Sequence, residues 1–227
     1  MPIKHPLFDP LEVPNYGFQE AVRYLHVPNG TLRYWLRPSV NLLIPADPAR
    51  NLFSFKNLIE CYVLEGLRAT HGVHLTAIRR AVEYLTKNYP SRHPLADYEL
   101  RTDGSHLYFS DQGESLTNLS LGGQLGIVPI LNTYLRRIER DLSRGQWILY
   151  PFTRAEYMQS PSDKPKVVSI SPNVCYGQPV LRGTRITIAT LVSRRFGGDS
   201  DEVLAKSYGR PATEIAEAIS WETGKAA

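Results

Sequence analysis

The residue types that carry most enzyme chemistry are present in this sequence, but their spacing does not build an active site. The chain contains no GxSxG, HExxH or GxGxxG motif, no phosphate-binding loop and no paired set of Cys and His ligands. His71 and His74 are spaced as metal ligands could be, but no third ligand follows, and histidines near helix ends are common as caps or surface groups. Ser200, in a Gly-Asp-Ser-Asp run, is better explained as a helix cap. We therefore expect a protein that is not an enzyme and that uses no metal or cofactor.

Composition limits the compartment and the size of the fold. The 227 residues are 42% hydrophobic, which is enough to form a buried core in one or two domains. The two cysteines, Cys61 and Cys175, are far apart and have no CxxC partner, so neither a disulfide framework nor a zinc knuckle is indicated. No apolar run reaches the roughly 18 residues that cross a bilayer, and residues 1–6 lack the apolar segment of a signal peptide. We expect a cytoplasmic protein without membrane association.

The positive charge of the chain is unevenly distributed. The formal net charge is +4: residues 1–92 carry 11 Lys/Arg and 7 Asp/Glu (+4), residues 93–165 carry 7 and 9 (−2), and residues 166–227 carry 8 and 6 (+2). A basic first third beside a slightly acidic middle favours contact between the N-terminal region and a polyanion.

Two short helices are predicted in the basic first third. Apolar residues repeat at helical spacing over 18–25, the chain turns at 27–29, and Asn29 is expected to cap a second helix that Pro38 ends. Leu32, Trp35 and Leu36 share the inner face of that second helix, so its other residues point outward. With Arg50 from the following loop, the candidate DNA contacts are Asn29, Gly30, Thr31, Arg33, Tyr34, Arg37 and Arg50.

The run Thr31-Leu32-Arg33-Tyr34-Trp35 resembles the second helix of the winged helix-turn-helix of MerR-type regulators. That resemblance implies operator DNA as a partner, with a strand at 41–44 and the link 45–50 forming the wing. The chain departs from the MerR pattern at 51–55, where Asn-Leu-Phe-Ser-Phe replaces an Arg-Tyr-Ser/Thr run. An alternative is a helical hairpin that only packs against its neighbours.

Two supporting helices are expected next. Ser54 is placed to cap a helix over 55–68, and a further helix begins at Leu75. Their predicted inward residues are Phe55, Leu58, Ile59, Tyr62 and Leu67 in the first, and Leu75, Ile78, Val82 and Leu85 in the second.

The middle of the chain is predicted to be a small α+β unit. A β-hairpin over 98–109 turns at Asp103-Gly104, a pair favoured in type I′ turns. A helix over 127–142 is predicted from apolar residues at alternating spacings of three and four. This seam either packs on its own hairpin and on 147–150 or forms a homodimer contact; it consists of Val128, Leu131, Leu135, Ile138 and Leu142.

A Ser- and Pro-containing linker over 153–166 precedes the last part of the chain. We expect this linker to let the C-terminal part act independently of the N-terminal helices. A strand is predicted at 167–170, then a hairpin that turns at Arg182-Gly183 with Gly183 at positive φ. Three helices follow, at 188–196, 201–208 and 212–223, and Ser200 is the predicted cap of the second.

Residues 177–186 read GxPVxxGTRI, and with the short helices that follow they resemble the antitoxin family known as domain of unknown function 433. The resemblance covers 167–221 and implies a partner toxin rather than a catalytic site, as in the VapB group, whose partners are PIN-domain ribonuclease toxins. Arg182 and Arg185 could instead pair internally with Asp199, Asp201 or Glu202. The candidate toxin contacts are Arg182, Gly183, Thr184, Arg185, Arg194 and Arg195.

The expected fold class is α+β, mainly α. The predicted domains are a MerR-like winged helix-turn-helix (1–90), an α+β linker or dimerisation domain (91–160) and an antitoxin-family domain (166–227). The resemblances imply an antitoxin of a type II toxin–antitoxin system: a homodimer that neutralises its cognate PIN-domain toxin and represses its own operon. The alternative is a MerR-like transcription regulator whose middle domain senses a ligand and which has no toxin partner.

Overall fold

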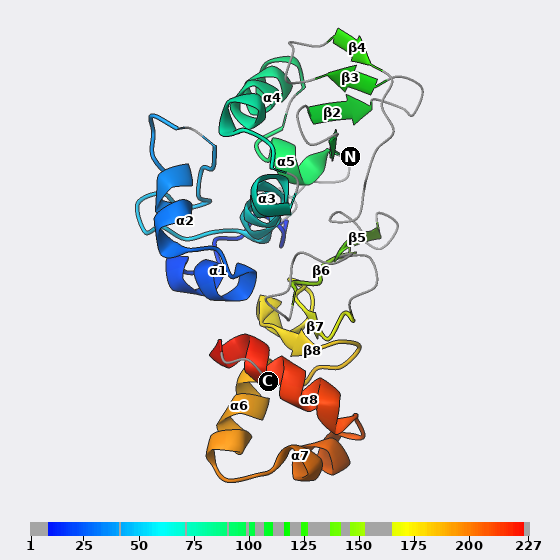
Figure 1. The fold of residues 1–227 in the computed structure, drawn as a ribbon. Helices are drawn as coiled ribbons and strands as arrows, with labels where there is room; N and C mark the ends of the chain where they lie inside the picture. Colours follow the sequence, from blue (N-terminus) through cyan, green and yellow to red (C-terminus); the bar gives the residue numbers. More distant parts are fainter. Residues whose placement is uncertain are drawn as a thin grey trace, which may run out of the picture.

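The computed structural model describes residues 9–40, 42–70, 72–89, 91–98, 100–102, 107–110, 116–118, 124–126, 137–141, 146–152 and 165–224. The fold is α+β and mainly α, as the sequence predicts. Helices of the N-terminal half occupy the upper part of Figure 1, with the first strands beside them, and the C-terminal helices occupy the lower part; the later strands, within residues 138–181, lie between the two groups of helices.

The helices of the N-terminal half follow the predicted order. Ser54 caps the third of them by accepting a hydrogen bond from Asn57 N at 3.2 Å, while Asn57 Oδ1 accepts one from Ser54 N at 3.1 Å. This reciprocal pairing satisfies backbone donors that a helix start leaves free. The elements are α1 (Phe18–Leu25), α2 (Asn29–Trp35), α3 (Phe55–Glu65), the π-helix η1 (Gly66–Thr70), α4 (Leu75–Asn88) and α5 (Pro94–Asp97).

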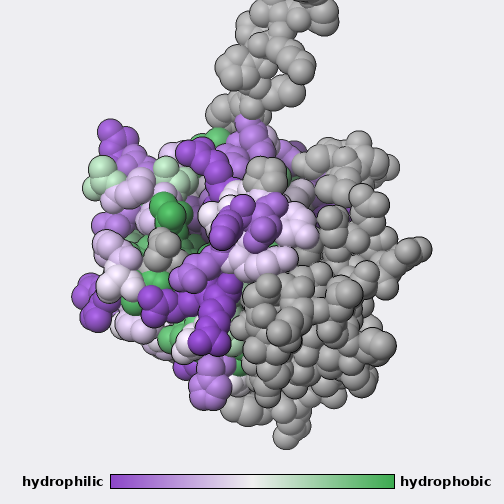
Figure 2. Space-filling model, turned by 90° about the horizontal axis from the view of Figure 1, so that it is seen from above, coloured by the Kyte–Doolittle hydropathy of each residue, from purple (hydrophilic) through white to green (hydrophobic). Residues whose placement is uncertain are grey.

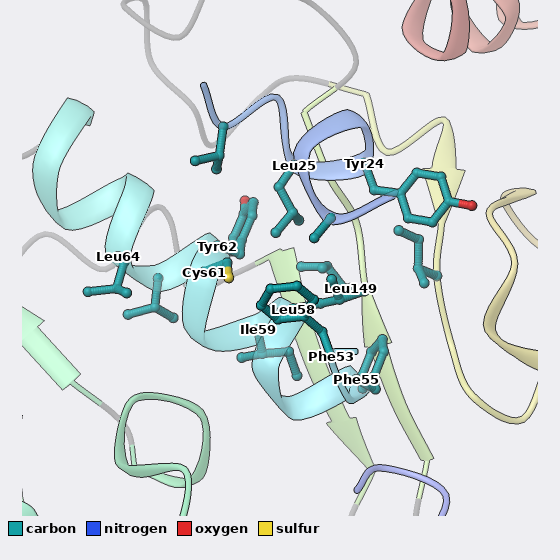
Figure 3. Packing of buried hydrophobic residues seen from close by; sticks show 14 of the residues in the cluster. Tyr24, Leu25, Phe53, Phe55, Leu58, Ile59, Cys61, Tyr62, Leu64 and Leu149 are labelled. Carbon is teal, nitrogen blue, oxygen red and sulfur yellow. The ribbon is translucent and has the colours of Figure 1, made fainter. Parts of the chain in front are cut away.

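The core of this half surrounds α3. All five residues predicted to point inward from 55–68 are buried, and Figure 3 shows Phe55, Leu58, Ile59 and Tyr62 packed together with Phe53 and Leu25. On α4, Ile78 and Leu85 are buried, and Leu75 and Val82 pack at the edge of the same cluster. The helical spacing of apolar residues therefore located the core side of both helices correctly.

Two details of the predicted winged unit are wrong. The cap of α2 is Pro28, and Asn29 is already helical; its Oδ1 accepts a hydrogen bond from Gln19 Nε2 at 3.4 Å instead. The proline φ of −57° suits the residue before a helix. Residues 42–44 are not a strand. Leu42 and Leu43 are consecutive and both buried, and Ile44 O accepts a hydrogen bond from the side-chain Nδ2 of Asn57 rather than from a neighbouring strand. The only pairing within 42–52 is an antiparallel bridge between Asp47 and Leu52.

The middle of the chain contains a four-stranded antiparallel sheet in the order β1-β2-β3-β4. Leu100 lies opposite Phe109 and Thr102 opposite Leu107, so the two antiparallel strands are present as predicted, but four residues connect them where a two-residue turn at Asp103-Gly104 would have placed Thr102 opposite Ser105. The Asp103-Gly104 turn lies outside the described residues, and the two further strands were not expected. The strands are β1 (Leu100–Thr102), β2 (Leu107–Ser110), β3 (Leu116–Asn118) and β4 (Gln124–Gly126).

The predicted helix over 127–142 is wrong at its C-terminal end. Residues Ile138–Asp141 form strand β5, which pairs antiparallel with β6 (Gln146–Leu149). Arg137 supports this extended course, because its guanidinium donates to Tyr150 O and Pro151 O. β6 follows β5 after only four residues, so pairing within this hairpin has overridden the helical spacing of the apolar residues. Val128, Leu131, Leu135 and Leu142 lie outside the described residues, so the homodimer seam stays a prediction.

The C-terminal part has the predicted order. β7 (Val168–Ser169) pairs antiparallel with β8 (Val180–Leu181), and Val180 also bridges to Thr187 across the turn. Gly183 has φ +73°, as predicted. Ser200 Oγ accepts a hydrogen bond from Val203 N, which confirms the predicted cap. The 3₁₀ turn η5 (Cys175–Gly177) precedes β8, and the helices are α6 (Ile188–Phe196), α7 (Asp201–Tyr208) and α8 (Ala212–Thr223).

The buried apolar residues of the N- and C-terminal parts form a single cluster, which includes Leu32, Leu58, Leu149, Ile170 and Trp221. Leu149 and Ile170 exchange two backbone hydrogen bonds of 2.9 and 2.8 Å, so the end of β6 is hydrogen-bonded to the C-terminal part. In Figure 1, β6, β7 and β8 lie between the N-terminal helices and α6–α8.

Candidate functional surfaces

The outer face of α2 and the segment just after it present unpaired positive charge. Arg33, Tyr34 and Arg37 are exposed, and neither arginine has an ion pair among the residues that the structure describes. The Arg33 Cζ lies 5.7 Å from the centre of the Phe18 ring, and the Arg37 Cζ lies 5.6 Å from the centre of the Tyr34 ring. A guanidinium over an aromatic face keeps its charge and its donors. These side chains can therefore donate to phosphates or base edges.

The other predicted DNA-contact residues differ in their surroundings. Asn29 and Gly30 are exposed at the start of α2, whereas Thr31 is half-buried. A Cβ on Gly30 would meet no atom within 4 Å, so a ligand could approach this turn closely. The Arg50 side chain is 78% exposed on the turn after Asp47, and its Nε lies 3.8 Å from an Asp47 carboxylate oxygen. Arg50 is therefore partly neutralised, unlike Arg33 and Arg37.

A buried polar cluster beneath the segment 42–47 was not predicted from the sequence. Asn57 Oδ1 accepts from Ala46 N, and Asn57 Nδ2 donates to Ile44 O, both at 2.9 Å. Asn57 Nδ2 also lies 3.1 Å from Glu60 Oε2. The side chain that forms half of the α3 cap thus also fixes the segment expected to be a wing. Only the position of Asn57 three residues after Ser54 signalled part of this role.

Glu60 and His93 form the centre of that cluster. The His93 Nδ1 lies 3.0 Å from Glu60 Oε2, and its Nε2 lies 3.2 Å from Glu12 Oε2. Burial lowers the pKa of His93, but the hydrogen bond and charge of Glu60, with the charge of Glu12, outweigh burial and raise it. Burial raises the pKa of Glu60, and His93 only partly offsets that rise. Lys56 bridges Glu12 and Asp97 at 2.9 and 3.1 Å, which adds a cation to the three carboxyl groups of the cluster.

The turn at Arg182-Gly183 is held by Thr184. The Thr184 hydroxyl donates to Leu181 O at 2.8 Å and accepts from Ile186 N at 3.0 Å, so its side chain closes the turn rather than facing a partner. The Arg182 Cζ lies 5.6 Å from the centre of the Tyr150 ring. Arg185 is exposed, and its guanidinium has no hydrogen bond, ion pair or ring contact within the described part of the chain.

Arg194 and Arg195 are separated from that turn. They lie in the last turn of α6, a nine-residue helix about 13 Å long, whose first residue follows the hairpin. Arg194 Nε pairs with Asp199 at 2.7 Å and Arg195 Nε with Asp201 at 3.1 Å. The aspartates considered as internal partners of Arg182 and Arg185 are thus taken by Arg194 and Arg195. The predicted toxin contacts therefore form two separate groups, one at the turn before α6 and one, the two paired arginines, at the C-terminal end of α6.

The 3₁₀ turn η5 is a feature that sequence analysis missed. Cys175, Tyr176 and Gly177 have φ of +46°, +56° and +80°, and the Tyr176 side chain is 91% exposed. Left-handed backbone is uncommon at residues other than glycine and costs about 1–3 kcal/mol at each. The only sequence signal was Gly177, the first residue of the GxPVxxGTRI motif.

Helix α8 packs directly on α1. The Trp221 and Tyr24 rings stack with centres 5.9 Å apart and an angle of 21° between their planes. His26 Nε2 lies 3.3 Å from Trp221 O, and Arg23 Nε lies 3.3 Å from Glu222 Oε1. The linker was expected to let the two parts act independently, but α8 of the C-terminal part is in direct contact with α1 of the N-terminal part. The linker residues 153–164 themselves lie outside the described residues.

Figure 2 shows one face of the molecule, on which hydrophilic side chains cover most of the coloured surface and hydrophobic ones form small areas between them. Within the described ranges, no group of three or more His, Cys, Asp or Glu residues is placed to hold a metal ion. None of the helices described has the length and apolar character needed to span a membrane.

Comparisons with known proteins place these features in context. Residues 168–221 match the family model described as "Protein of unknown function (DUF433)". Two Mycobacterium tuberculosis (strain ATCC 25618 / H37Rv) proteins are similar over most of the chain: "Putative antitoxin VapB45", 27% identical over 92% of this chain and 93% of the relative, and "Uncharacterized protein Rv2308", 25% identical over 91% and 89%. The crystal structure of Rv2018 from Mycobacterium tuberculosis superposes with a TM-score of 0.63 and 25% identity, covering 91% of this chain and 98% of that one. The chain is thus similar to the DUF433 family over its C-terminal part and to a relative named as a putative VapB antitoxin over most of its length.

Proposed function

We propose that the protein is the antitoxin of a type II toxin–antitoxin pair, which binds and neutralises a PIN-domain ribonuclease toxin. The observation that carries the proposal is the similarity to an antitoxin-named relative over 92% of the chain, rather than over the C-terminal motif alone. The match of residues 168–221 to DUF433 agrees with it. A non-catalytic role is consistent with both, since neutralising a toxin requires only a binding surface.

We further propose that the protein acts in the cytoplasm as a homodimer and represses its own operon through α2. The unpaired Arg33 on the outer face of this helix and the unpaired Arg37 just beyond its end support the DNA-binding part, because such cations supply phosphate and base-edge contacts. A symmetric dimer would suit a palindromic operator. Domain boundaries at 1–90, 91–160 and 166–227 belong to the same proposal.

The direct test is growth rescue. The reading frame next to the gene is expressed from an inducible promoter, alone or with this protein, and the purified pair is examined for a stable complex. The proposal expects the neighbouring product to arrest growth and this protein to restore it. A neighbour that is harmless, or a toxic one that this protein neither binds nor relieves, would contradict the proposal and favour a regulator that senses a ligand.

A further inference from the structure

Tyr176 is presented to solvent by a strained turn. Of the large apolar side chains in the described chain, it is the most exposed, at 91%, and no ring contact or hydrogen bond holds its side chain. Cys175 and Tyr176 nevertheless both adopt left-handed backbone, with φ of +46° and +56°. Strain of this kind persists only where surrounding structure enforces it, and it is concentrated at functional sites. Because the Tyr176 ring is not buried, packing in the core does not explain why the turn is strained.

Three contacts enforce the turn. Asn15 Nδ2 donates to Tyr176 O at 2.7 Å, and the Cys175 thiol donates to Arg185 O at 3.3 Å. Gly177 is buried against Tyr16, where a Cβ would lie only 2.2 Å from the hydroxyl oxygen, so no larger residue fits. Asn15 and Tyr16 precede α1, so the N-terminal part shapes a surface of the C-terminal part.

Arg185 lies on the segment next to Tyr176. Its carbonyl is joined to Cys175, and its exposed guanidinium has no partner within the described residues. We define the Tyr176 patch as Asn15, Cys175, Tyr176 and Arg185. An exposed tyrosine on a backbone turn that is held in place, next to a segment that carries an unpaired arginine, has the composition of a binding hot spot, because tyrosine and arginine are the residue types enriched there.

We propose that the Tyr176 patch is the anchor on which this protein docks an acidic segment of its protein partner. The inference rests on the proposed function, in which that partner is the toxin. The charge of the patch selects the chemistry: Arg185 is its only cation and has no carboxylate of its own, and a planar guanidinium pairs with a carboxylate through two parallel hydrogen bonds. Nucleic acid would also stack on a tyrosine, but its electrostatic binding uses several cations along the backbone, and this patch has one.

One consequence is that the docking surface needs both ends of the chain. Residues 165–224 alone lack Asn15 and Tyr16, which hold the turn. The candidate contacts Arg194 and Arg195, already paired with Asp199 and Asp201 at the far end of α6, lie outside the patch.

The test measures the dissociation constant between the full chain and the purified product of the adjoining reading frame by titration calorimetry. Tyr176→Ala and Arg185→Ala should each raise the dissociation constant on the order of 30-fold, as loss of a hot-spot residue does. Asn15→Ala should raise it by about 3- to 10-fold, because the turn loses one of its restraints. Phe196→Ala is the matched control: Phe196 is 78% exposed in the same part of the chain, at the end of α6, and its removal should leave the constant unchanged.

A second variant separates binding from folding. Tyr176→Asn places a residue that tolerates left-handed backbone at the strained position, so its melting temperature should equal or exceed that of the wild type. Its affinity should fall as far as that of Tyr176→Ala.

The outcomes are distinguishable. If the wild-type protein binds the neighbouring product and the Tyr176 and Arg185 variants bind it equally well, the docking inference is wrong while the proposed function stands. If only Phe196→Ala weakens the complex, docking occurs at the other end of α6 and the inference is again overturned. If Tyr176→Ala weakens binding to DNA but not to the protein, the patch is a nucleic-acid contact instead. No binding by the wild type would overturn both proposals.

Discussion

At the scale of single residues, Arg33 on α2 and Arg37, two residues beyond the end of α2, have different expected roles. Both are exposed and lie over aromatic rings, but Arg33 lies nearer the start of α2, the end that reads bases in helix-turn-helix proteins. A base contact and a phosphate contact affect binding differently, because only the first depends on sequence.

Arg33→Ala should weaken operator binding by about 1–3 kcal/mol and relax its specificity, whereas Arg37→Ala should weaken binding to all sequences alike. Gel-shift titrations at several salt concentrations test this, since loss of one phosphate contact reduces the salt slope by about one. Arg80→Ala, at an exposed position on α4, is the matched control. If the Arg33/Arg37 double variant binds the operator as the wild type does, α2 is not the reading helix.

His93 gives the protein a pH-dependent element of stability. Its folded-state pKa is raised above the ordinary value of 6.5, mainly through Glu60, so its contribution is complete below pH 6.5 and is lost as the pH rises through the folded pKa. The raised pKa of Glu60 acts in the same direction, because the folded pair holds more protons than the unfolded one. His26 opposes this trend, since burial lowers its pKa.

His93→Gln should therefore lose most stability below pH 6.5 and progressively less above it. The measurement is the difference in free energy of unfolding between the wild type and this variant, from urea titrations between pH 5.5 and 8.5. His74→Gln, at an exposed position, should show no such difference. A difference that is constant with pH would mean that His93 does not change its protonation in the folded protein over this range.

At the scale of elements, the hairpin turn of the C-terminal part depends on one glycine. Gly183 has φ +73°, and a Cβ there would meet no atom within 4 Å. The cost of a substitution is therefore backbone strain rather than a steric clash.

Gly183→Val should destabilise the protein by about 1–3 kcal/mol, and Gly183→Asn by less, because asparagine tolerates left-handed backbone. Thermal unfolding of both variants measures the difference. Equal stability of the valine variant and the wild type would show that the turn can relax into another conformation.

At the scale of the whole molecule, α1 and α8 join the two ends of the chain. Trp221 is almost fully buried against Tyr24, and Glu222 reaches Arg23. Removing residues 166–227 would uncover this surface and the backbone of Leu149 that pairs with Ile170. Such a truncation is therefore not a neutral way to isolate the DNA-binding part.

Trp221→Ala should destabilise the protein by about 3–5 kcal/mol, the usual range for a buried tryptophan. Hydrogen exchange should show the loss of protection in α1 and α3 as well as in α8, because the three share one apolar cluster. Phe196→Ala, at an exposed site, should change stability by less than about 0.5 kcal/mol. Faster exchange confined to α6–α8 would show that the C-terminal part unfolds by itself.

The sequence by itself determined most of the helices. In the C-terminal part the three predicted helices begin and end where the structure has them, and the caps at Ser54 and Ser200 were identified correctly. These features depend on contacts within a few residues, which apolar spacing and capping residues record directly. The positive φ of Gly183 could likewise be predicted from the residues of the turn alone.

Only the tertiary structure decided the rest. Ile138–Asp141 became a strand through its pairing with Gln146–Leu149, although the local pattern favoured a helix. The left-handed turn at Tyr176 depends on Asn15, a residue 161 positions away in the chain. The sequence showed Arg182, Arg185, Arg194 and Arg195 as equivalent, and folding paired the last two with aspartates while leaving Arg185 without a partner among the described residues. The contact of Asn15 with Tyr176 leaves no periodic signal in the sequence. The hairpin and the arginine–aspartate pairs join residues that are nearer in the chain, but they depend on how the chain reverses direction, which apolar spacing does not record.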